Sequence, residues 1–355
     1  MTPTLSRSCA FRASILFLLC SLSAFARTAP REPTMTNNPL LANPRPWCIG
    51  RFVMNRPARS ELNSERYAYW GDKIDIKSDV SVQAFQHRVE LRETELRAKT
   101  RTGSISYKEM QAKGLKSLIV KTDIPWLERV ISPTQTSRVF FYSDDVDHPD
   151  LLLNEEGYVL AGTTMLTMKS LLRPGDVQKS IERTSDVYRN ITYRDDWTVP
   201  SGPGFCVKGA LIGGPSRNSE ESQQTIVLQP GKASAFVLSM RVAVDGDQRA
   251  TLLGTLPDLR RELQTQGYGN TVTVLRESKR QVAGMDAEEV LFSVTENGIQ
   301  LFRFFLLAPG VPKAVARPYV DIQLILGSTN DSTLTPEQAS SPVDEKGYRD
   351  MGLAA

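Results

Sequence analysis

The sequence has few of the side chains that most often carry out catalysis or bind metals. Only two of its 355 residues are histidines, and only four are cysteines. No Cys-x-x-Cys or His-Glu-x-x-His pair occurs, so the common zinc sites are missing. The Gly-x-Ser-x-Gly elbow of esterases and a Gly-rich phosphate-binding loop are missing as well. We therefore expect no cofactor, no metal and no catalytic residues; an exported enzyme with an atypical site is the alternative.

The two histidines do not change this expectation. His87 falls in a charged stretch that is predicted to be helical, where a solvated surface side chain is expected. His148 lies in the acidic segment 144–150, which departs from the calcium-loop pattern because a valine takes one ligand position and the required glycine is absent. We interpret the segment as an acidic surface loop, with weak cation binding as the alternative.

Neither sign of charge dominates the sequence. It has 43 basic and 40 acidic side chains and no cluster of lysines and arginines. Since nucleic-acid binding needs a clustered basic surface, no nucleic-acid partner is expected. The length and the 40% of hydrophobic residues are sufficient for two packed domains. Beyond the N-terminal segment, no apolar stretch reaches the roughly 20 residues of a membrane span.

The first 26 residues are typical of a cleavable signal peptide. Two arginines precede the apolar stretch 15–25, which ends in Ala24-Phe25-Ala26 and so satisfies the small-x-small rule for cleavage after Ala26. A buried N-terminal helix is one alternative. A lipoprotein anchored at Cys20 is another, but lipoprotein cleavage needs a small residue before the cysteine, and that residue is Leu19. We predict a soluble, exported product.

Cleavage would leave two cysteines, Cys48 and Cys206, in the mature chain. In an exported protein, two cysteines are most simply explained by one disulfide. Two buried free thiols are the alternative, and only the geometry of the fold can decide between them.

The first half of the chain predicts strands on either side of a long helix. The helix is expected at 80–102, with Val82, Phe85, Val89 and Leu96 on one stripe. A second helix opens after Gly175-Asp176, with Val177, Ile181, Val187 and Ile191 as its apolar positions. Strands are expected at 47–54, 73–76, 117–121, 138–142 and 158–168.

The second half begins as the first does, with a strand that carries a cysteine, Phe205-Cys206-Val207. Alternating apolar residues predict a strand at 236–244. Thr255 is expected to cap a helix that Gly267 ends. Asn297-Gly298 predicts a tight hairpin turn. The remaining strands are expected at 271–276, 288–295, 299–307 and 320–326.

These elements predict an α+β protein with two domains, each an antiparallel β-sheet covered by helices. Ser201-Gly202-Pro203-Gly204 marks the expected boundary between them. The polar C-terminal end is expected to fray. The predicted organisation is a signal peptide at 1–26, a flexible leader at 27–46, domains at 47–200 and 201–330, and a polar tail at 331–355.

Several short segments resemble one family, the immunity proteins for the fourth class of type VI secretion lipase effectors. The resembling segments are Cys48-Ile49-Gly50-Arg51-Phe52, Gly204-Phe205-Cys206-Val207, the stretch 280–289 and Pro318-Tyr319-Val320-Asp321-Ile322. The resemblance implies a two-domain periplasmic protein that is not an enzyme. It implies further that the protein binds a phospholipase effector and blocks its access to lipid, which protects the producing cell.

A protein that inhibits by contact needs exposed anchors, and aromatic residues and arginines are the usual ones. Tyr67, Tyr69 and Trp70 lie in a loop-like stretch before the long helix, and Trp197 lies between the predicted domains. We consider these four as partner-binding candidates, with core packing as the alternative for each. A structural or scaffold protein of the cell envelope is the alternative function, which a lipase gene beside this one would argue against.

Overall fold

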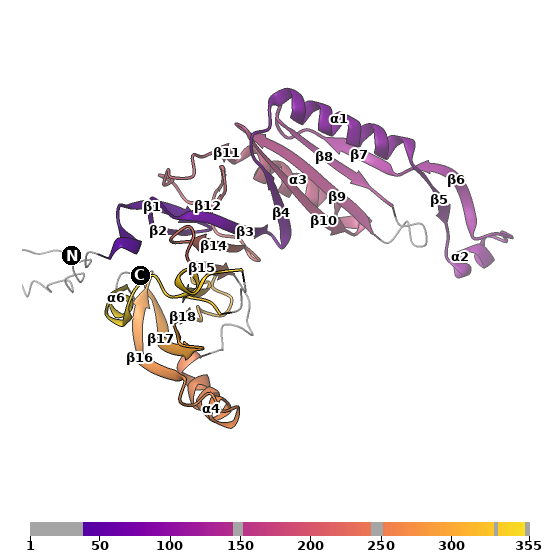
Figure 1. The fold of residues 1–355 in the computed structure, drawn as a ribbon. Coiled ribbons are helices and arrows are strands. Elements are labelled where there is room, and N and C mark those ends of the chain that lie inside the picture. The colour runs from indigo at the N-terminus through magenta and orange to yellow at the C-terminus, as the bar shows by residue number, and fades with distance from the viewer. Residues whose placement is uncertain (1–37, 145–151, 243–250, 330–332, 352–355) are drawn as a thin grey trace, which may run out of the picture. The chain divides into compact units, whose positions relative to one another are not determined.

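The computed structural model describes residues 38–144, 152–242, 251–329 and 333–351. Its largest element is a sheet of twelve strands in the order β16-β17-β18-β19-β15-β14-β3-β4-β10-β9-β8-β7. All of its neighbouring strands are antiparallel. Both halves of the chain contribute to it, and Figure 1 shows helices beside the strands of each half.

The first half supplies the six strands at one end of this sheet and the two longest helices of that half. The strands are β3 (Glu61–Tyr69), β4 (Asp72–Lys77), β7 (Leu127–Ile131), β8 (Ser137–Tyr142), β9 (Leu153–Ala161) and β10 (Thr164–Leu172). The helices are α1 (Val82–Ala98) and α3 (Val177–Arg189), the latter preceded by the short 3-10 turn η2 (Pro174–Asp176).

Strand β8 shows how the two helices cover opposite faces. Phe140 packs in the core cluster under α1, together with Phe85 and Val89 of that helix. Phe141 packs in the other cluster, with Tyr188 of α3. Successive side chains of a strand point to opposite faces, so one continuous apolar strand serves two cores. The predicted stripe on α1 is confirmed at Phe85, Val89 and Leu96, but Val82 is 52% exposed in the first turn.

The buried face of α3 differs from the prediction. Ser180, Thr184 and Tyr188 are its buried side chains, whereas Val177, Ile181 and Val187 are only partly buried. The reason is Glu155, a buried carboxylate of β9 that accepts hydrogen bonds from the hydroxyls of Ser180 and Thr184. A polar helix face can be buried when its groups are hydrogen-bonded in this way.

The second half supplies the other six strands. They are β14 (Glu221–Val227), β15 (Ser234–Arg241), β16 (Val272–Val282), β17 (Met285–Glu296), β18 (Ile299–Ala308) and β19 (Tyr319–Leu326). β14 pairs with β3, so the strands of the two halves meet there. The predicted Asn297-Gly298 turn is confirmed between β17 and β18, with positive φ at both residues.

Helix α4 (Leu252–Thr265) follows Thr251 as its N-terminal cap residue, four positions before the predicted cap Thr255. Thr255 lies inside the helix, and its hydroxyl donates to the carbonyl of Leu252. The free N–H of Leu253 in the first turn instead donates to the carboxylate of Glu288 on β17, at 2.8 Å. A partner from a distant strand satisfies the helix start, so local sequence could not indicate it.

Two segments predicted as single strands are hairpins, and one stretch predicted to be loop-like is a strand. The predicted strand 47–54 is the hairpin β1 (Pro44–Ile49) and β2 (Phe52–Pro57), which turns at Gly50 with φ +54°. The predicted strand 158–168 is split between β9 and β10 by a turn at Gly162. The stretch that holds Tyr67 and Tyr69 is strand β3, paired on both sides.

The smaller elements complete the chain. A three-stranded sheet joins β11 (Ile191–Tyr193), β13 (Ala210–Gly213) and β12 (Gly204–Val207). A separate pair of strands, β5 (Thr100–Ser104) and β6 (Ile119–Pro125), carries the short helix α2 (Tyr107–Ala112) between them. The 3-10 turn η1 (Pro39–Leu41) precedes β1, and two helices end the described chain, α5 (Pro336–Ala339) and α6 (Glu345–Met351).

Both ends of the described chain pack into the core. Leu40, inside the predicted leader, is fully buried beside strands of the second half. Tyr348 of α6 is 1% exposed and stacks on Phe302 with ring centroids 4.6 Å apart. The expectation of a frayed C-terminal end is therefore wrong for residues 333–351. The predicted signal peptide lies outside the described residues.

The fold is α+β with two domains, as the sequence predicts. The domain boundaries given above stay predictions.

Candidate functional site

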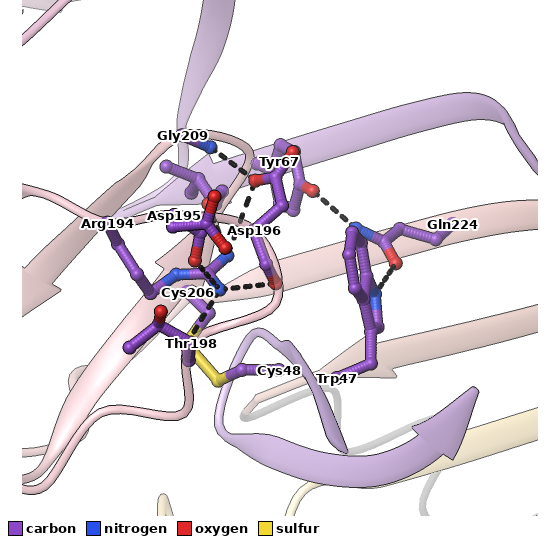
Figure 2. The surroundings of a disulfide bond; sticks show 11 residues. Trp47, Cys48, Tyr67, Arg194, Asp195, Asp196, Thr198, Cys206, Gly209 and Gln224 are labelled. Carbon is purple, nitrogen blue, oxygen red and sulfur yellow. Dashed lines mark hydrogen bonds and ion pairs between the residues drawn. A yellow bond between two sulfur atoms is a disulfide. The ribbon is translucent and has the colours of Figure 1, made fainter. Parts of the chain in front are cut away.

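The predicted disulfide is present between Cys48 of β1 and Cys206 of β12 (Figure 2). The two Cα atoms are 5.9 Å apart, and both cysteines are buried. The strands also pair at this point, because Gly50 and Cys206 exchange backbone hydrogen bonds of 3.0 and 2.7 Å. Covalent and hydrogen bonds thus join the β1–β2 hairpin to the small sheet of β11, β12 and β13.

A buried chain of hydrogen bonds runs beside the disulfide (Figure 2). The indole N–H of Trp47 donates to Gln224 Oε1 at 2.7 Å, and the Gln224 amide donates to the hydroxyl of Tyr67 at 2.7 Å. Tyr67 donates in turn to the Glu65 carboxylate at 3.0 Å. Burial raises the pKa of Glu65, an effect that Lys208 opposes from 3.4 Å. These hydrogen bonds connect β1, β14 and β3.

Arg194 closes the loop 194–198 over the disulfide. Its guanidinium is nearly buried and donates to the backbone carbonyls of Val207, Asp196 and Thr198 at 3.0, 2.8 and 3.1 Å. Burial lowers the pKa of Arg194, against the opposing field of Asp196. These bonds hold Trp197 in place at the end of the loop.

Trp197 is half-buried in a stack of aromatic rings and arginines. Its ring meets that of Trp47 edge to face at a centroid distance of 4.9 Å. The guanidinium of Arg45 lies 4.4 Å from the Trp197 centroid, and that of Arg56 lies 4.9 Å from it and 4.2 Å from Trp47. Cation–π contacts of this kind add stability when they are partly desolvated. Trp197 therefore packs against Trp47, the sequence neighbour of Cys48, and stays partly exposed.

Two of the four candidate anchors are core residues. Tyr67 and Tyr69 are 1% and 3% exposed, and both rings pack near Phe205. Burial raises the pKa of each tyrosine. In this fold neither side chain is on the surface, so the alternative of core packing applies to both.

Trp70 is the exposed member of the set. It is 39% exposed on the tight turn between β3 and β4, with a φ of +60° that is uncommon for a bulky residue. The guanidinium of Arg183 on α3 lies 5.0 Å from its ring centroid, and that of Arg217 lies 5.8 Å away. The Gly71 N–H donates to the Ser219 carbonyl at 3.0 Å and fixes the turn. Trp70 is thus held in one orientation, in reach of a partner.

A small cavity lies behind Trp70. Its volume is about 30 Å³, enough for one water, and its lining includes Asp72, Glu155 and Tyr188. Burial raises the pKa of Asp72 to about 6, an effect that Arg183 opposes. Trp70 and Arg183 also line this cavity, which therefore borders the turn that carries Trp70.

A larger apolar cleft separates β2 from the face of the second-half sheet. Its volume is about 390 Å³, and Phe52, Met54, Phe236, Leu238 and Ile322 are among its lining residues. Such a cleft can accept apolar side chains. The sequence alone does not indicate this cleft or the contacts of Trp47, Arg56 and Arg194, because they depend on residues distant in sequence.

The described residues hold no group of three histidine, cysteine or acidic side chains that could bind a metal ion. His87 is exposed on α1, as expected, whereas His148 lies outside the described residues. Among the helices that the structure describes, none has the length and apolar character needed to cross a membrane.

Comparison with protein families gives two matches that together span most of the chain. Residues 45–195 match the Tle cognate immunity protein 4 N-terminal domain, and residues 198–346 match the C-terminal domain of the same protein family. The chain belongs to the Tle cognate immunity protein 4 family. A search of curated protein sequences found no match.

Solved structures show the same fold. The "crystal structure of Tle4-Tli4 complex" contains a chain that is 19% identical with a TM-score of 0.71, and the match covers 88% of this chain and 96% of that one. The apo immunity protein TplEi of the type VI secretion system of Pseudomonas aeruginosa is 18% identical with a TM-score of 0.69, covering 87% and 94%. The same protein complexed with the "L" peptide has a TM-score of 0.65 at 18% identity, covering 88% and 96%.

Proposed function

We propose that this protein is a periplasmic immunity protein that binds a type VI secretion phospholipase effector and blocks it sterically. The observation that carries the proposal is the match of the two family domains over residues 45–195 and 198–346. The solved relatives add support, since one was crystallised in a Tle4-Tli4 complex and another with a peptide. Export through a signal peptide cleaved after Ala26 would place the protein in the compartment where a disulfide persists.

Inhibition without catalysis is part of the same proposal. The chain has no nucleophile elbow and no common zinc motif. A steric inhibitor needs only a preorganised surface that competes with lipid for the effector. The disulfide, the Trp47–Gln224–Tyr67 hydrogen bonds and the loop closed by Arg194 supply that rigidity, because groups that are already ordered lose less entropy on binding.

Trp70 is the anchor that we propose for the effector interface. Tryptophan and arginine dominate the binding energy of protein interfaces, and the guanidinium groups of Arg183 and Arg217 lie 5.0 and 5.8 Å from the Trp70 ring centroid. Trp197 is a weaker candidate, because much of its ring already packs against Trp47 and the arginines around it.

The test is a titration of the purified mature chain with its cognate phospholipase effector, which we expect to be encoded beside its gene. We expect a tight complex for the wild type. Trp70→Ala should weaken it about 30-fold or more, the effect of losing one hot-spot residue. Tyr268→Ala is the matched control, because Tyr268 is also an exposed aromatic, 52% exposed after α4, and should leave the affinity unchanged. Absence of any complex with the wild type would contradict the proposal.

A further inference from the structure

The strands β5 and β6 form an arm that is separate from the twelve-stranded sheet. They pair antiparallel from Thr100↔Pro125 to Ser104↔Ile119, and α2 follows β5 at the far end. Figure 1 shows this arm continuing beyond the end of α1, with α2 at its tip. A two-stranded ribbon is at best marginally stable alone, so the arm needs support from its base.

The base of the arm provides that support. The nearly buried guanidinium of Arg101 lies 2.8 Å from Glu128 Oε1. The backbone N–H of Trp126 donates to the Lys99 carbonyl at 2.9 Å. The next residue, Leu127, is buried in the core cluster under α1. The beginning and the end of the arm are thus fixed to the first-half domain.

The tip is held by local hydrogen bonds and buries no side chain of α2. Ser106 Oγ accepts the N–H of Glu109 at the start of that helix, at 3.2 Å. The Leu115 N–H donates to the Met110 carbonyl at 3.0 Å, and the Ile105 N–H donates to the Leu118 carbonyl at 2.9 Å. Backbone geometry therefore determines the tip, and its apolar side chains are not needed to form a core.

Those apolar side chains face solvent. Tyr107, Leu115, Leu118 and Ile119 are 63%, 42%, 43% and 54% exposed. Every residue from 111 to 119 is exposed. Within the described part of the chain, no other segment of this length has four large apolar side chains this exposed. Single exposed apolar residues are ordinary, but a group of them marks an interaction site.

The charges of the tip are mostly positive. Lys108, Lys113 and Lys116 are exposed, and Lys113 forms an ion pair of 2.6 Å with Glu109. Lys108 and Lys116 have no ion-pair partner among the described residues. The tip therefore combines an apolar group with two unpaired ammonium groups beside it, and a complementary surface would be apolar with an acidic rim.

We propose that the tip, residues 107–119, inserts into an apolar depression with an acidic rim on the cognate effector. The inference rests on the function proposed above. A phospholipase must have an apolar surface that admits acyl chains, and a narrow, basic, apolar tip is suited to such a recess. A membrane is a poorer match, because membrane-surface binding uses a large amphipathic face, whereas α2 has only six residues.

The test uses the full mature chain and two tip variants, Leu118→Ser with Ile119→Ser, and Lys108→Glu with Lys116→Glu. Leu91→Ser is the matched control, because Leu91 is 57% exposed on α1, away from the tip. We expect the apolar variant to bind the effector at least about 30-fold more weakly with an unchanged melting temperature. The charge variant should associate with the effector more slowly than the wild type. The difference between the two association rates should become smaller at high salt. The control should bind like the wild type.

A further variant with a shortened arm tests the inference independently, in case a tip variant misfolds. Ser104 and Ile119 face each other, so an Asn-Gly turn can replace residues 105–118. If the shortened-arm variant and the tip variants bind the effector as tightly as the wild type, the inference is wrong. Sedimentation of the wild type, but not the tip variants, with anionic vesicles would overturn it in favour of a lipid surface, provided effector binding is equal. If the wild type itself binds no effector, the proposed function fails instead.

Discussion

Removal of the Cys48–Cys206 disulfide should destabilise the fold more than any other change of two side chains that we consider. The bridge joins residues 158 positions apart. In the chain-entropy model, a loop of this length restricts the unfolded chain by about 5 kcal/mol. The paired backbone at Gly50 and Cys206 and the packing around it remain in the reduced protein, so they do not add to this figure.

The experiment compares the wild type with the double variant Cys48→Ala, Cys206→Ala. For one cooperative unit of this size, a loss of about 5 kcal/mol corresponds to a melting temperature lower by roughly 7 °C. Real bridges often give less, so we expect a decrease of roughly 3–7 °C, measured by calorimetry with and without reductant. The wild type should lose stability in reductant, and the double variant should not respond to it.

Mass spectrometry of non-reduced peptides from periplasmic material checks the bond itself. If both thiols are alkylated without reduction, the disulfide is absent. If the double variant has the same melting temperature as the wild type, the disulfide does not stabilise the fold. The β1–β2 hairpin would then be positioned by Trp47 and its hydrogen bonds alone.

Three further predictions concern other parts of the chain. Tyr348→Ala should destabilise the protein by about 3 kcal/mol in urea unfolding, because Tyr348 is buried against Phe302. Tyr348→Phe should have little effect, since the hydroxyl has no hydrogen-bond partner among the described residues; equal losses would contradict the packing explanation. Burial raises the pKa of Asp72 from 3.8 to about 6, so its protonated form stabilises the fold below about pH 4 and this stabilisation is lost as the pH rises through 6. Asp72→Asn should therefore stabilise the protein at pH 8, by up to about 2 kcal/mol, and change little at pH 4; the opposite pH dependence would refute the assignment. In N-terminal sequencing of the protein from an envelope fraction, the sequence should begin at Arg27, whereas an intact Met1 or a lipid on Cys20 would contradict the predicted cleavage.

The sequence was informative where local chemistry determines structure. Asn297-Gly298 predicts its hairpin correctly because both residues accept the positive φ that the turn requires. The pairing of Cys48 with Cys206 follows from counting cysteines after export. Gly50 and Gly162 also have positive φ in their turns, but neither follows an asparagine or aspartate, so the sequence does not divide the segments 47–54 and 158–168 into hairpins.

The sequence was uninformative where a distant partner changes the character of a residue. Glu155 makes Ser180 and Thr184 the buried face of α3, although neither is apolar. Strand β3 is polar over most of its length, with Asn63, Ser64, Glu65 and Arg66 before the two tyrosines, so its sequence does not indicate that Tyr67 and Tyr69 are buried. Trp70 remained exposed because it lies on the turn after that strand, and only the fold brings Arg183 and Arg217 to it.

The most direct test of the proposed function is inhibition of the cognate phospholipase effector. The effector's phospholipase activity is measured on lipid vesicles while the purified mature protein is added up to a several-fold molar excess. We expect activity to fall to background near stoichiometric addition, and this protein alone to hydrolyse no lipid. Full effector activity at that excess, or lipid hydrolysis by this protein alone, would contradict the proposal that it is a steric inhibitor.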